Sequence, residues 1–195
     1  MAFVVLDTAK TPAGKLPDGW NLKVTSGRPD AATTDDGGAQ VLHLKSVKSS
    51  FALERSVDVD TAKMPYLAWR WKVTQLPVGG DFRHFTKDDQ AAQVMVAFED
   101  RRVLSYLWDT TAPQGTMQSA TSLPLLHIFA VVCRSGVAEE NRWLEESHDV
   151  AADYRKAYGK PAPRVKGLRL QINSQHTGTS AESYFADVAF HSSPQ

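Results

Sequence analysis

Three stretches between residues 66 and 109 alternate apolar and polar side chains with a period of two, which is the spacing of a β-strand with one buried face. The apolar faces carry Leu67, Trp69, Trp71 and Val73 in the first stretch, Ala92, Val94, Val96 and Phe98 in the second, and Leu104, Tyr106 and Trp108 in the third. Burying one large apolar side chain contributes about 1.5–3 kcal/mol. We therefore expect these faces to form the middle of the core, and the more polar faces to meet water or to line a shallow cleft.

Shorter alternating stretches lie on both sides of this region. They span residues 3–6, 41–45, 51–59, 125–133, 141–145, 165–173 and 182–190. In the last of them Tyr184, Val188 and Phe190 are expected to share one face. Residues 109–122 are rich in small polar residues and predict a long irregular loop, and loops of that length are often functional.

One segment changes to the helical period. The apolar residues of the segment 150–158 are Val150, Ala151, Tyr154, Ala157 and Tyr158, which share one face of a helix. Asp149 is a suitable N-cap, and Gly159 followed by Pro161 is a suitable end. The sequence predicts one short α-helix near residues 149–158.

About ten strands and a single helix predict an all-β fold, a two-sheet antiparallel β-sandwich. A length of 195 residues fits one domain spanning residues 1–195.

The charge balance argues against one class of partner. Lys and Arg together number 22, as do Asp and Glu, and no basic stripe is present, so nucleic acid is not an expected partner. The longest apolar run, residues 123–133, is too short for a transmembrane segment. The chain begins without the basic and apolar regions of an export signal, which taken alone indicates a cytoplasmic protein.

The common catalytic and cofactor motifs are absent from the sequence. His84, His127, His148 and His176 lack the spacing of zinc ligands, and Cys133 is expected to be a buried thiol. No nucleophile-elbow or phosphate-loop motif is present. We therefore expect no cofactor and no metal site, with one exception considered next.

An acidic pair, Asp88 and Asp89, lies where a loop enters a core strand. The pair is interpreted as a strand-end turn or an ion-pair partner of Arg70, or alternatively as ligand-binding carboxylates at the mouth of the sandwich. A structural calcium ion is a third interpretation, although two aspartates supply only part of the six to eight oxygens that Ca²⁺ takes.

Several other polar side chains fall on the less apolar phase of the strands, namely Arg70, Gln93, Asp109, Arg134 and His127. If they converge, they make a cleft that binds hydroxyl or carboxylate groups. The alternative is a scatter of surface charges and core ion pairs. Together with the acidic pair, the predicted ligand-binding residues are Arg70, Asp88, Asp89, Gln93, Asp109 and Arg134.

Six ordered motifs resemble a bacterial family known as domain of unknown function 3047. They are Trp69-Arg70-Trp71-Lys72-Val73, Asp88-Asp89-Gln90-Ala91-Ala92-Gln93-Val94, Tyr106-Leu107-Trp108-Asp109, Arg134-Ser135-Gly136, Asp153-Tyr154-Arg155 and Ala186-Asp187-Val188-Ala189-Phe190. The resemblance implies a jelly-roll or galactose-binding-like sandwich, as in carbohydrate-binding modules. It also implies export, hence a periplasmic or secreted protein. The turn after Ile172 is acidic in many relatives but reads Asn173-Ser174-Gln175-His176 here, so neither a metal site nor a polar site on that turn is carried over.

The leading hypothesis is a non-catalytic binding module of the cell envelope that takes a carbohydrate-like or small polar ligand. Because this rests on an analogy of fold, two alternatives stay open. One is a hydrolase or lyase that acts on a glycan through two carboxylates such as Asp89 and Asp109, which requires both to face a cleft. The other is a structural domain that binds another protein through an exposed apolar face.

Overall fold

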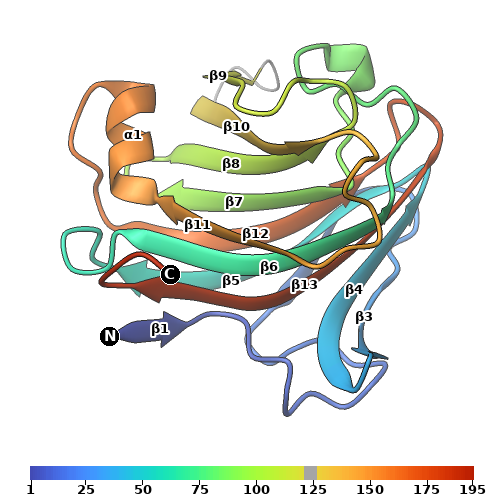
Figure 1. The fold of residues 1–195 in the computed structure, drawn as a ribbon, viewed down its shortest axis with the longest axis horizontal. Helices are drawn as coiled ribbons and strands as arrows, with labels where there is room; N and C mark the ends of the chain where they lie inside the picture. Colours follow the sequence, from blue (N-terminus) through green and yellow to red (C-terminus); the bar gives the residue numbers. More distant parts are fainter. Residues whose placement is uncertain (121–126) are drawn as a thin grey trace.

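The computed structural model describes residues 1–120 and 127–195. Its strands form two sheets that pack face to face, and most strands of both run in nearly the same direction across Figure 1. This is the aligned packing of a β-sandwich. The prediction of an all-β, two-sheet sandwich is confirmed.

The first sheet, called sheet A, has the strand order β11-β6-β13-β4-β3, with β1 also paired to β13. Its strands are β1 (Ala2–Val4), β3 (Ala31–Asp36), β4 (Ala39–Val47), β6 (Tyr66–Gln75), β11 (Leu144–Asp149) and β13 (Ser180–His191). All of its pairs are antiparallel.

The second sheet, sheet B, has the order β2-β5-β12-β7-β8-β10-β9. Its strands are β2 (Asn21–Ser26), β5 (Ser50–Val59), β7 (Ala92–Phe98), β8 (Arg102–Asp109), β9 (Met117–Ser119), β10 (His127–Ser135) and β12 (Val165–Asn173). The short 3₁₀-helix η1 (Phe85–Lys87) precedes β7.

The sequence predicted antiparallel pairs throughout, and the pair of β8 with β10 corrects this because it is parallel. Parallel neighbours need a crossover rather than a tight turn, and residues 110–120 are the described part of this connection. The expected irregular loop is also not wholly irregular, since β9 lies within it and pairs antiparallel with β10. The expected start of a strand at Leu125 falls outside the described residues.

The core is built from the predicted aromatic faces. Trp69, Trp71, Tyr106 and Trp108 are all at most 1% exposed. The ring centroids of Trp69 and Trp71 lie 5.4 Å apart at an interplanar angle of 85°, and Trp71 lies 5.9 Å from Trp108 across the two sheets. Such edge-to-face and tilted contacts add to the energy of burial itself.

Two strands differ from expectation in phase or length. In β13 a bulge between Ala186 and Ala189, with Asp187 at φ 54°, shifts the alternation by one residue. Phe185 is therefore buried with Val188 and Phe190, whereas Tyr184 is only partly buried. The strand expected at residues 141–145 begins at Leu144 and continues to Asp149.

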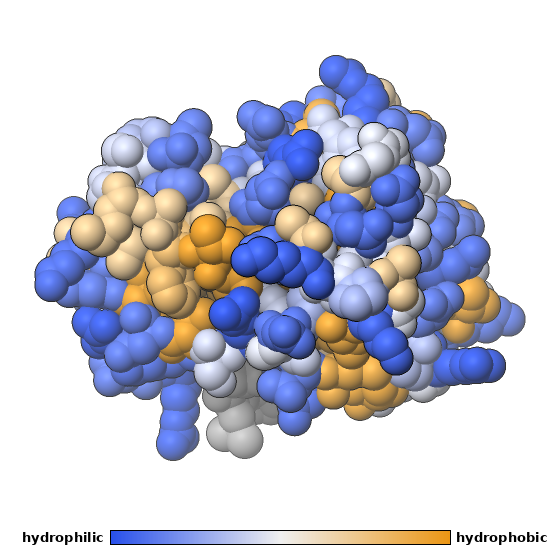
Figure 2. Space-filling model, turned by 90° about the horizontal axis from the view of Figure 1, so that it is seen from below, coloured by the Kyte–Doolittle hydropathy of each residue, from blue (hydrophilic) through white to orange (hydrophobic). Residues whose placement is uncertain are grey.

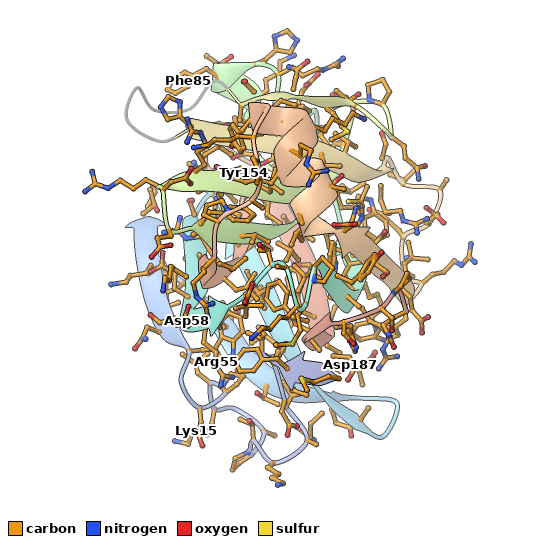
Figure 3. The ribbon with its side chains drawn as sticks, turned by 90° about the vertical axis from the view of Figure 1, so that its left-hand side faces the viewer. Lys15, Arg55, Asp58, Phe85, Tyr154 and Asp187 are labelled. Carbon is orange, nitrogen blue, oxygen red and sulfur yellow. The ribbon has the colours of Figure 1, made fainter. Side chains whose placement is uncertain are left out.

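The helix α1 (Val150–Tyr158) packs at one end of the sandwich, where Figure 3 shows Tyr154. The Asp149 side chain accepts a hydrogen bond from the Ala152 N–H, and Gly159 ends the helix at φ 70°, a left-handed conformation that glycine adopts without strain. Tyr154 is fully buried against Phe98, with ring centroids 4.5 Å apart. Both helix boundaries agree with the prediction.

Replacing Trp71 with alanine tests the central role of this core. The Trp71→Ala variant is expected to lose about 3–5 kcal/mol of unfolding free energy, because a fully buried indole leaves a cavity between the sheets. Urea unfolding of both proteins measures the loss. The control is Val78→Ala at a side chain that is 74% exposed, for which a change within about 0.5 kcal/mol is expected. Equal stability of the two variants would contradict the assignment.

Candidate functional site

A cleft of about 930 Å³ lies on the face of sheet B that points away from the core. Its floor comes from the side chains that alternate with core residues along β5, β12, β7 and β8. These include Glu54, Arg169, Gln171, Gln93, Met95 and Ser105. The polar phase of these strands therefore lines a cleft, one of the two outcomes that the alternation predicted.

The register of the strands arranges the floor in rows. Arg169 pairs with Glu54 on one side and with Met95 on the other, and Met95 pairs with Ser105. The adjacent row places Gln171 beside Gln93. Since residues directly opposite each other on one face lie about 5 Å apart, each row presents a continuous strip of side chains to the cleft.

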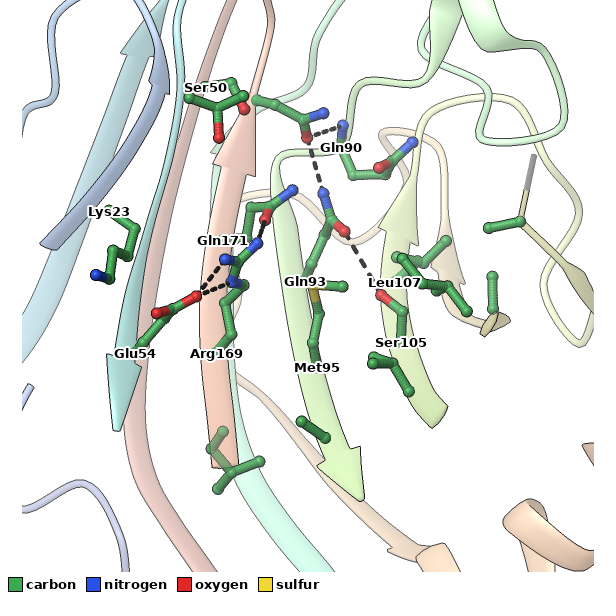
Figure 4. Close-up of a pocket in the computed structure, with 18 of the residues that line it drawn as sticks. Lys23, Ser50, Glu54, Gln90, Gln93, Met95, Ser105, Leu107, Arg169 and Gln171 are labelled. Atoms are coloured by element: carbon green, nitrogen blue, oxygen red, sulfur yellow. Dashed lines mark hydrogen bonds and ion pairs between the residues drawn. The ribbon is translucent and has the colours of Figure 1, made fainter. Parts of the chain in front are cut away.

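Hydrogen bonds fix the orientation of these side chains, as Figure 4 shows. The guanidinium of Arg169 donates from Nε to Glu54 Oε1 over 2.8 Å and from Nη1 to Gln171 Oε1 over 3.1 Å. The pair is only partly covered, because the Arg169 and Glu54 side chains are 36% and 33% exposed. The charged groups are thus held in place while remaining open to a ligand.

A second network is centred on the buried Asn173. Its Oδ1 accepts from Gln93 Nε2 at 2.8 Å and from the Gln90 N–H at 3.0 Å, and its Nδ2 donates to the Asp88 carbonyl at 2.8 Å. Ser105 Oγ donates to Gln93 Oε1 at 3.5 Å. The network joins β12, β7 and β8 to the loop that precedes β7, so that loop is positioned by the floor of the cleft.

One aromatic side chain stands at the edge of the cleft. Phe85 of η1 lines it and is 62% exposed, and its ring centroid lies 5.5 Å from that of His176. An exposed phenyl ring beside amide and charged groups offers an apolar surface on which a ring of a ligand can stack.

Asp88 also lines the cleft, and its environment disfavours the charged carboxylate. Burial raises the pKa of Asp88 to about 6, against a smaller lowering by the hydrogen bond from Gln90 Nε2. The nearby carboxylates Asp89 and Asp109 act in the same direction as burial. Asp88 therefore changes charge close to neutral pH.

Asp89 and Asp109 are both fully buried. Asp109 accepts hydrogen bonds from three backbone N–H groups, those of Phe82, Thr111 and Ala112, at 2.8–3.0 Å. Asp89 accepts from the Thr177 N–H at 2.6 Å. The hypothesis of a glycan-cleaving pair formed by Asp89 and Asp109 is wrong, because neither carboxylate faces the cleft. They hold the loops at the ends of the strands.

The two predicted arginines lie elsewhere. Arg70 Nε forms an ion pair with Asp187 Oδ2 at 2.6 Å, so the suggested pair with the Asp88–Asp89 loop does not form. Arg134 binds Glu146 at 2.6 Å and Glu139 at 3.1 Å. Of the six predicted residues, the structure brings Asp88 and Gln93 into the cleft, and it separates Arg70, Asp89, Asp109 and Arg134 from it.

Glu54, Arg169 and Gln171 line the cleft but were not among the residues predicted from the sequence. A signal was present, because Arg169 and Gln171 alternate with buried residues of β12 and Glu54 follows the buried Leu53 of β5, so all three lie on the outward phase. What the sequence did not give is the position of β12 between β5 and β7, which brings them beside Gln93.

Exposed apolar side chains bear on the hypothesis of a protein-binding face. The view in Figure 2 is mostly hydrophilic, with apolar side chains gathered in separate areas. Large exposed apolar residues lie on different elements, among them Phe3 and Val4 on β1 and Leu22 and Val24 on β2. This distribution does not single out one face for a partner.

A family model described as "Protein of unknown function (DUF3047)" matches residues 18–189. The chain belongs to this family. The resemblance inferred from the six motifs is thereby confirmed. No curated protein matches this DUF3047 chain in sequence. In the described part of the chain, no helix is long and apolar enough to cross a membrane.

Solved structures share the fold at low sequence identity. The xyloglucanase domain of NopAA, a type three effector from Sinorhizobium fredii, is 9% identical with a TM-score of 0.54, and the match covers 97% of this chain and 100% of that one. The family 11 carbohydrate-binding module of the cellulase Lic26A-Cel5E of Clostridium thermocellum is 9% identical with a TM-score of 0.49, covering 96% and 94%. The first match supports the assignment of the DUF3047 chain to this sandwich fold.

The raised pKa of Asp88 predicts in which direction the stability of the protein changes with pH. Its folded-state value of about 6 lies above the ordinary 3.8, so the folded protein binds this proton more tightly than the unfolded chain. The ionised carboxylate therefore destabilises the fold above pH 6, and this effect disappears as the pH falls toward 4. The stability of Asp88→Asn relative to the wild type is expected to be greatest near pH 7 and to shrink on acidification.

Carboxyl ¹³C NMR titration measures the pKa directly. We expect a midpoint near pH 6 for Asp88, while Asp58, whose pKa is lowered to about 2 by Arg164 and Lys166, stays ionised over that range. A midpoint near 4 for Asp88 would show that its carboxylate is solvated and not buried at the cleft.

Proposed function

We propose that the cleft of sheet B binds a carbohydrate chain or a similar small polar ligand, and that the protein is a non-catalytic binding module. The observation that carries this is the fixed array of amide and charged side chains on the cleft floor, formed by Glu54, Arg169, Gln171 and Gln93, with Phe85 exposed at the edge.

The chemistry of the array fits hydroxyl groups. A sugar hydroxyl donates one hydrogen bond and accepts others; amides do both, carboxylates accept, and guanidinium donates in a planar fork. These groups are already oriented by one another, so binding costs less ordering of side chains than it would on an unconnected surface. An exposed phenyl ring supplies the apolar contact that the C–H face of a sugar ring favours.

The dimensions also suit this class of ligand. Pockets for small molecules usually have volumes of about 300–1,000 Å³, and the cleft is close to the upper end at about 930 Å³. A cleft that follows a sheet across several strands favours an elongated ligand over a compact one.

The fold match adds a choice of ligand to test. The xyloglucanase domain of NopAA is described in complex with cellobiose. At 9% identity the likeness concerns the fold, but it makes β-linked glucans the first probes. A module of this kind meets polysaccharide outside the cytoplasm, which favours the periplasm or the exterior, as the family resemblance implied.

Isothermal titration calorimetry with cello-oligosaccharides, xyloglucan oligosaccharides and mixed-linkage glucan tests the proposal. Arg169→Ala is expected to weaken binding by roughly ten- to a hundredfold, because hydrogen bonds to charged groups contribute about 1.5–3 kcal/mol each. Gln93→Ala is expected to weaken it as well, while Arg70→Ala on sheet A leaves it unchanged. The melting temperature of each variant separates loss of binding from loss of fold.

Three results would overturn the proposal or part of it. Binding that Arg70→Ala weakens as much as Arg169→Ala would move the ligand away from the cleft. Absence of binding to any glycan of a wider panel would remove the carbohydrate assignment. The appearance of new reducing ends after incubation would show that the protein cleaves its ligand, contrary to a purely binding role.

A further inference from the structure

Three side chains with metal-binding atoms meet at the edge of the sandwich, away from the cleft. They are Cys133 on β10 of sheet B and Glu146 and His148 on β11 of sheet A. One ligand atom from each lies within 4.8 Å of the other two. Among the described residues this is the only group of at least three Cys, His, Asp or Glu side chains that meets this condition.

Two of the distances between these ligand atoms are close to those in the coordination shell of a tetrahedral ion. Cys133 Sγ lies 3.4 Å from His148 Nε2, and His148 Nε2 lies 3.7 Å from Glu146 Oε2. Bonds of about 2.3 Å from zinc to sulfur and about 2.0–2.2 Å to nitrogen and oxygen place neighbouring tetrahedral ligands roughly 3.3–3.6 Å apart. The two measured distances lie within a few tenths of an ångström of these values, and the third, from Cys133 Sγ to the Glu146 carboxylate, is at most 4.8 Å.

The surroundings of His148 orient it toward this point. Its Nδ1 lies 3.5 Å from Asp153 Oδ2, and that oxygen accepts a hydrogen bond from the Tyr106 hydroxyl at 2.8 Å. The imidazole stacks on Trp69, with ring centroids 5.4 Å apart and an interplanar angle of 19°. A carboxylate behind Nδ1 and a fixed ring plane are what metal-bound histidines commonly have.

The other two ligands are oriented as well. The Arg134 guanidinium binds Glu146 Oε1 and leaves Oε2 to face His148. Cys133 lies at an irregularity in the pairing of β10 with β8, where the register shifts between Val132 and Arg134. Bulges of this kind re-aim a side chain.

We propose that Cys133, Glu146 and His148 bind a zinc-type divalent ion, with Asp153 as the residue that positions His148 and with the fourth coordination position open. The soft thiolate together with imidazole favours zinc over calcium or magnesium, which prefer oxygen ligands. The divalent charge offsets the thiolate and Glu146, whose Oε1 also pairs with Arg134. Because the ligands come from both sheets, the ion ties the edges of the sandwich together.

A nucleophilic role for the same cysteine is less consistent with the structure. Cys133, His148 and Asp153 follow one another in the order of a catalytic triad, but Cys133 is only 7% exposed and lines neither the cleft nor the smaller surface pocket beside Glu146. Neither pocket brings a substrate into contact with the sulfur.

Titration of the purified protein, first stripped with a chelator, with Co²⁺ tests the site. We expect one equivalent to produce a near-ultraviolet band from thiolate-to-cobalt charge transfer together with visible bands of tetrahedral intensity, both removed by Zn²⁺. Cys133→Ser abolishes the ultraviolet band, and Asp153→Asn weakens cobalt binding by about 10–100-fold. The matched control is His84→Gln, at an exposed histidine, which leaves the spectrum unchanged.

A second measurement does not depend on the variants folding. Zinc at about 100 times its dissociation constant is expected to raise the melting temperature of the wild type by roughly 5–10 °C, and a chelator reverses the rise. X-ray absorption at the zinc edge is expected to show one sulfur and nitrogen or oxygen ligands in the first shell. A spectrum without sulfur, or a cobalt band that survives in Cys133→Ser, would overturn the proposal. Neither readout involves a glycan, so this test is independent of the cleft.

Discussion

The packing of aromatic side chains between the two sheets is the constraint on which the rest of the structure depends. Trp69 and Trp71 on β6 meet Tyr106 and Trp108 on β8, and all four are almost completely buried. Because side chains alternate between the faces of a strand, a register that buries these rings also decides which side chains face outward. Ser105, for example, faces the cleft because Tyr106 faces the core.

The buried carboxylates of the loops follow from the same requirement. Strands that end in a dense core leave the following backbone without ladder partners, and buried N–H groups need acceptors. Asp109, the last residue of β8, accepts from two N–H groups of the loop that follows and from that of Phe82 in the loop before β7. Asp89 accepts from one in the turn after β12. Acidic residues at strand ends are therefore a weak sign of a catalytic site in a sandwich, and here they are part of the scaffold that positions the cleft.

Alternation predicted the core faces of β6, β7 and β8, and capping residues predicted α1, because both signals are local. The features that were predicted wrongly depend on contacts between residues that lie far apart in the sequence or on irregularities of the backbone. Nothing near residue 187 in the sequence announces the bulge that places Phe185 in the core. The parallel pairing of β10 with β8 depends on a crossover, and no local pattern in either strand announces its direction. Gln93 was predicted as a cleft residue from its outward position in the alternation of β7. Arg169 lies beside Gln93 only because β12 is the neighbour of β7 in sheet B, which the sequence does not reveal.

The strand β11 was predicted to begin and end too early in the sequence, because its last residues are polar. Residues 145–149 are all polar, yet they form an edge strand of sheet A, and Glu146 and His148 turn inward. An inward-pointing charged side chain on an edge strand protects the strand from pairing with a strand of another molecule. This protection explains one charged residue on β11. It does not account for a thiol at 3.4 Å from the imidazole or for a carboxylate behind that ring. A bound ion explains the thiol, the imidazole and the carboxylate together. The ion links β10 and β11 at the edge of the sandwich, where the other strands are linked by apolar contacts across the core.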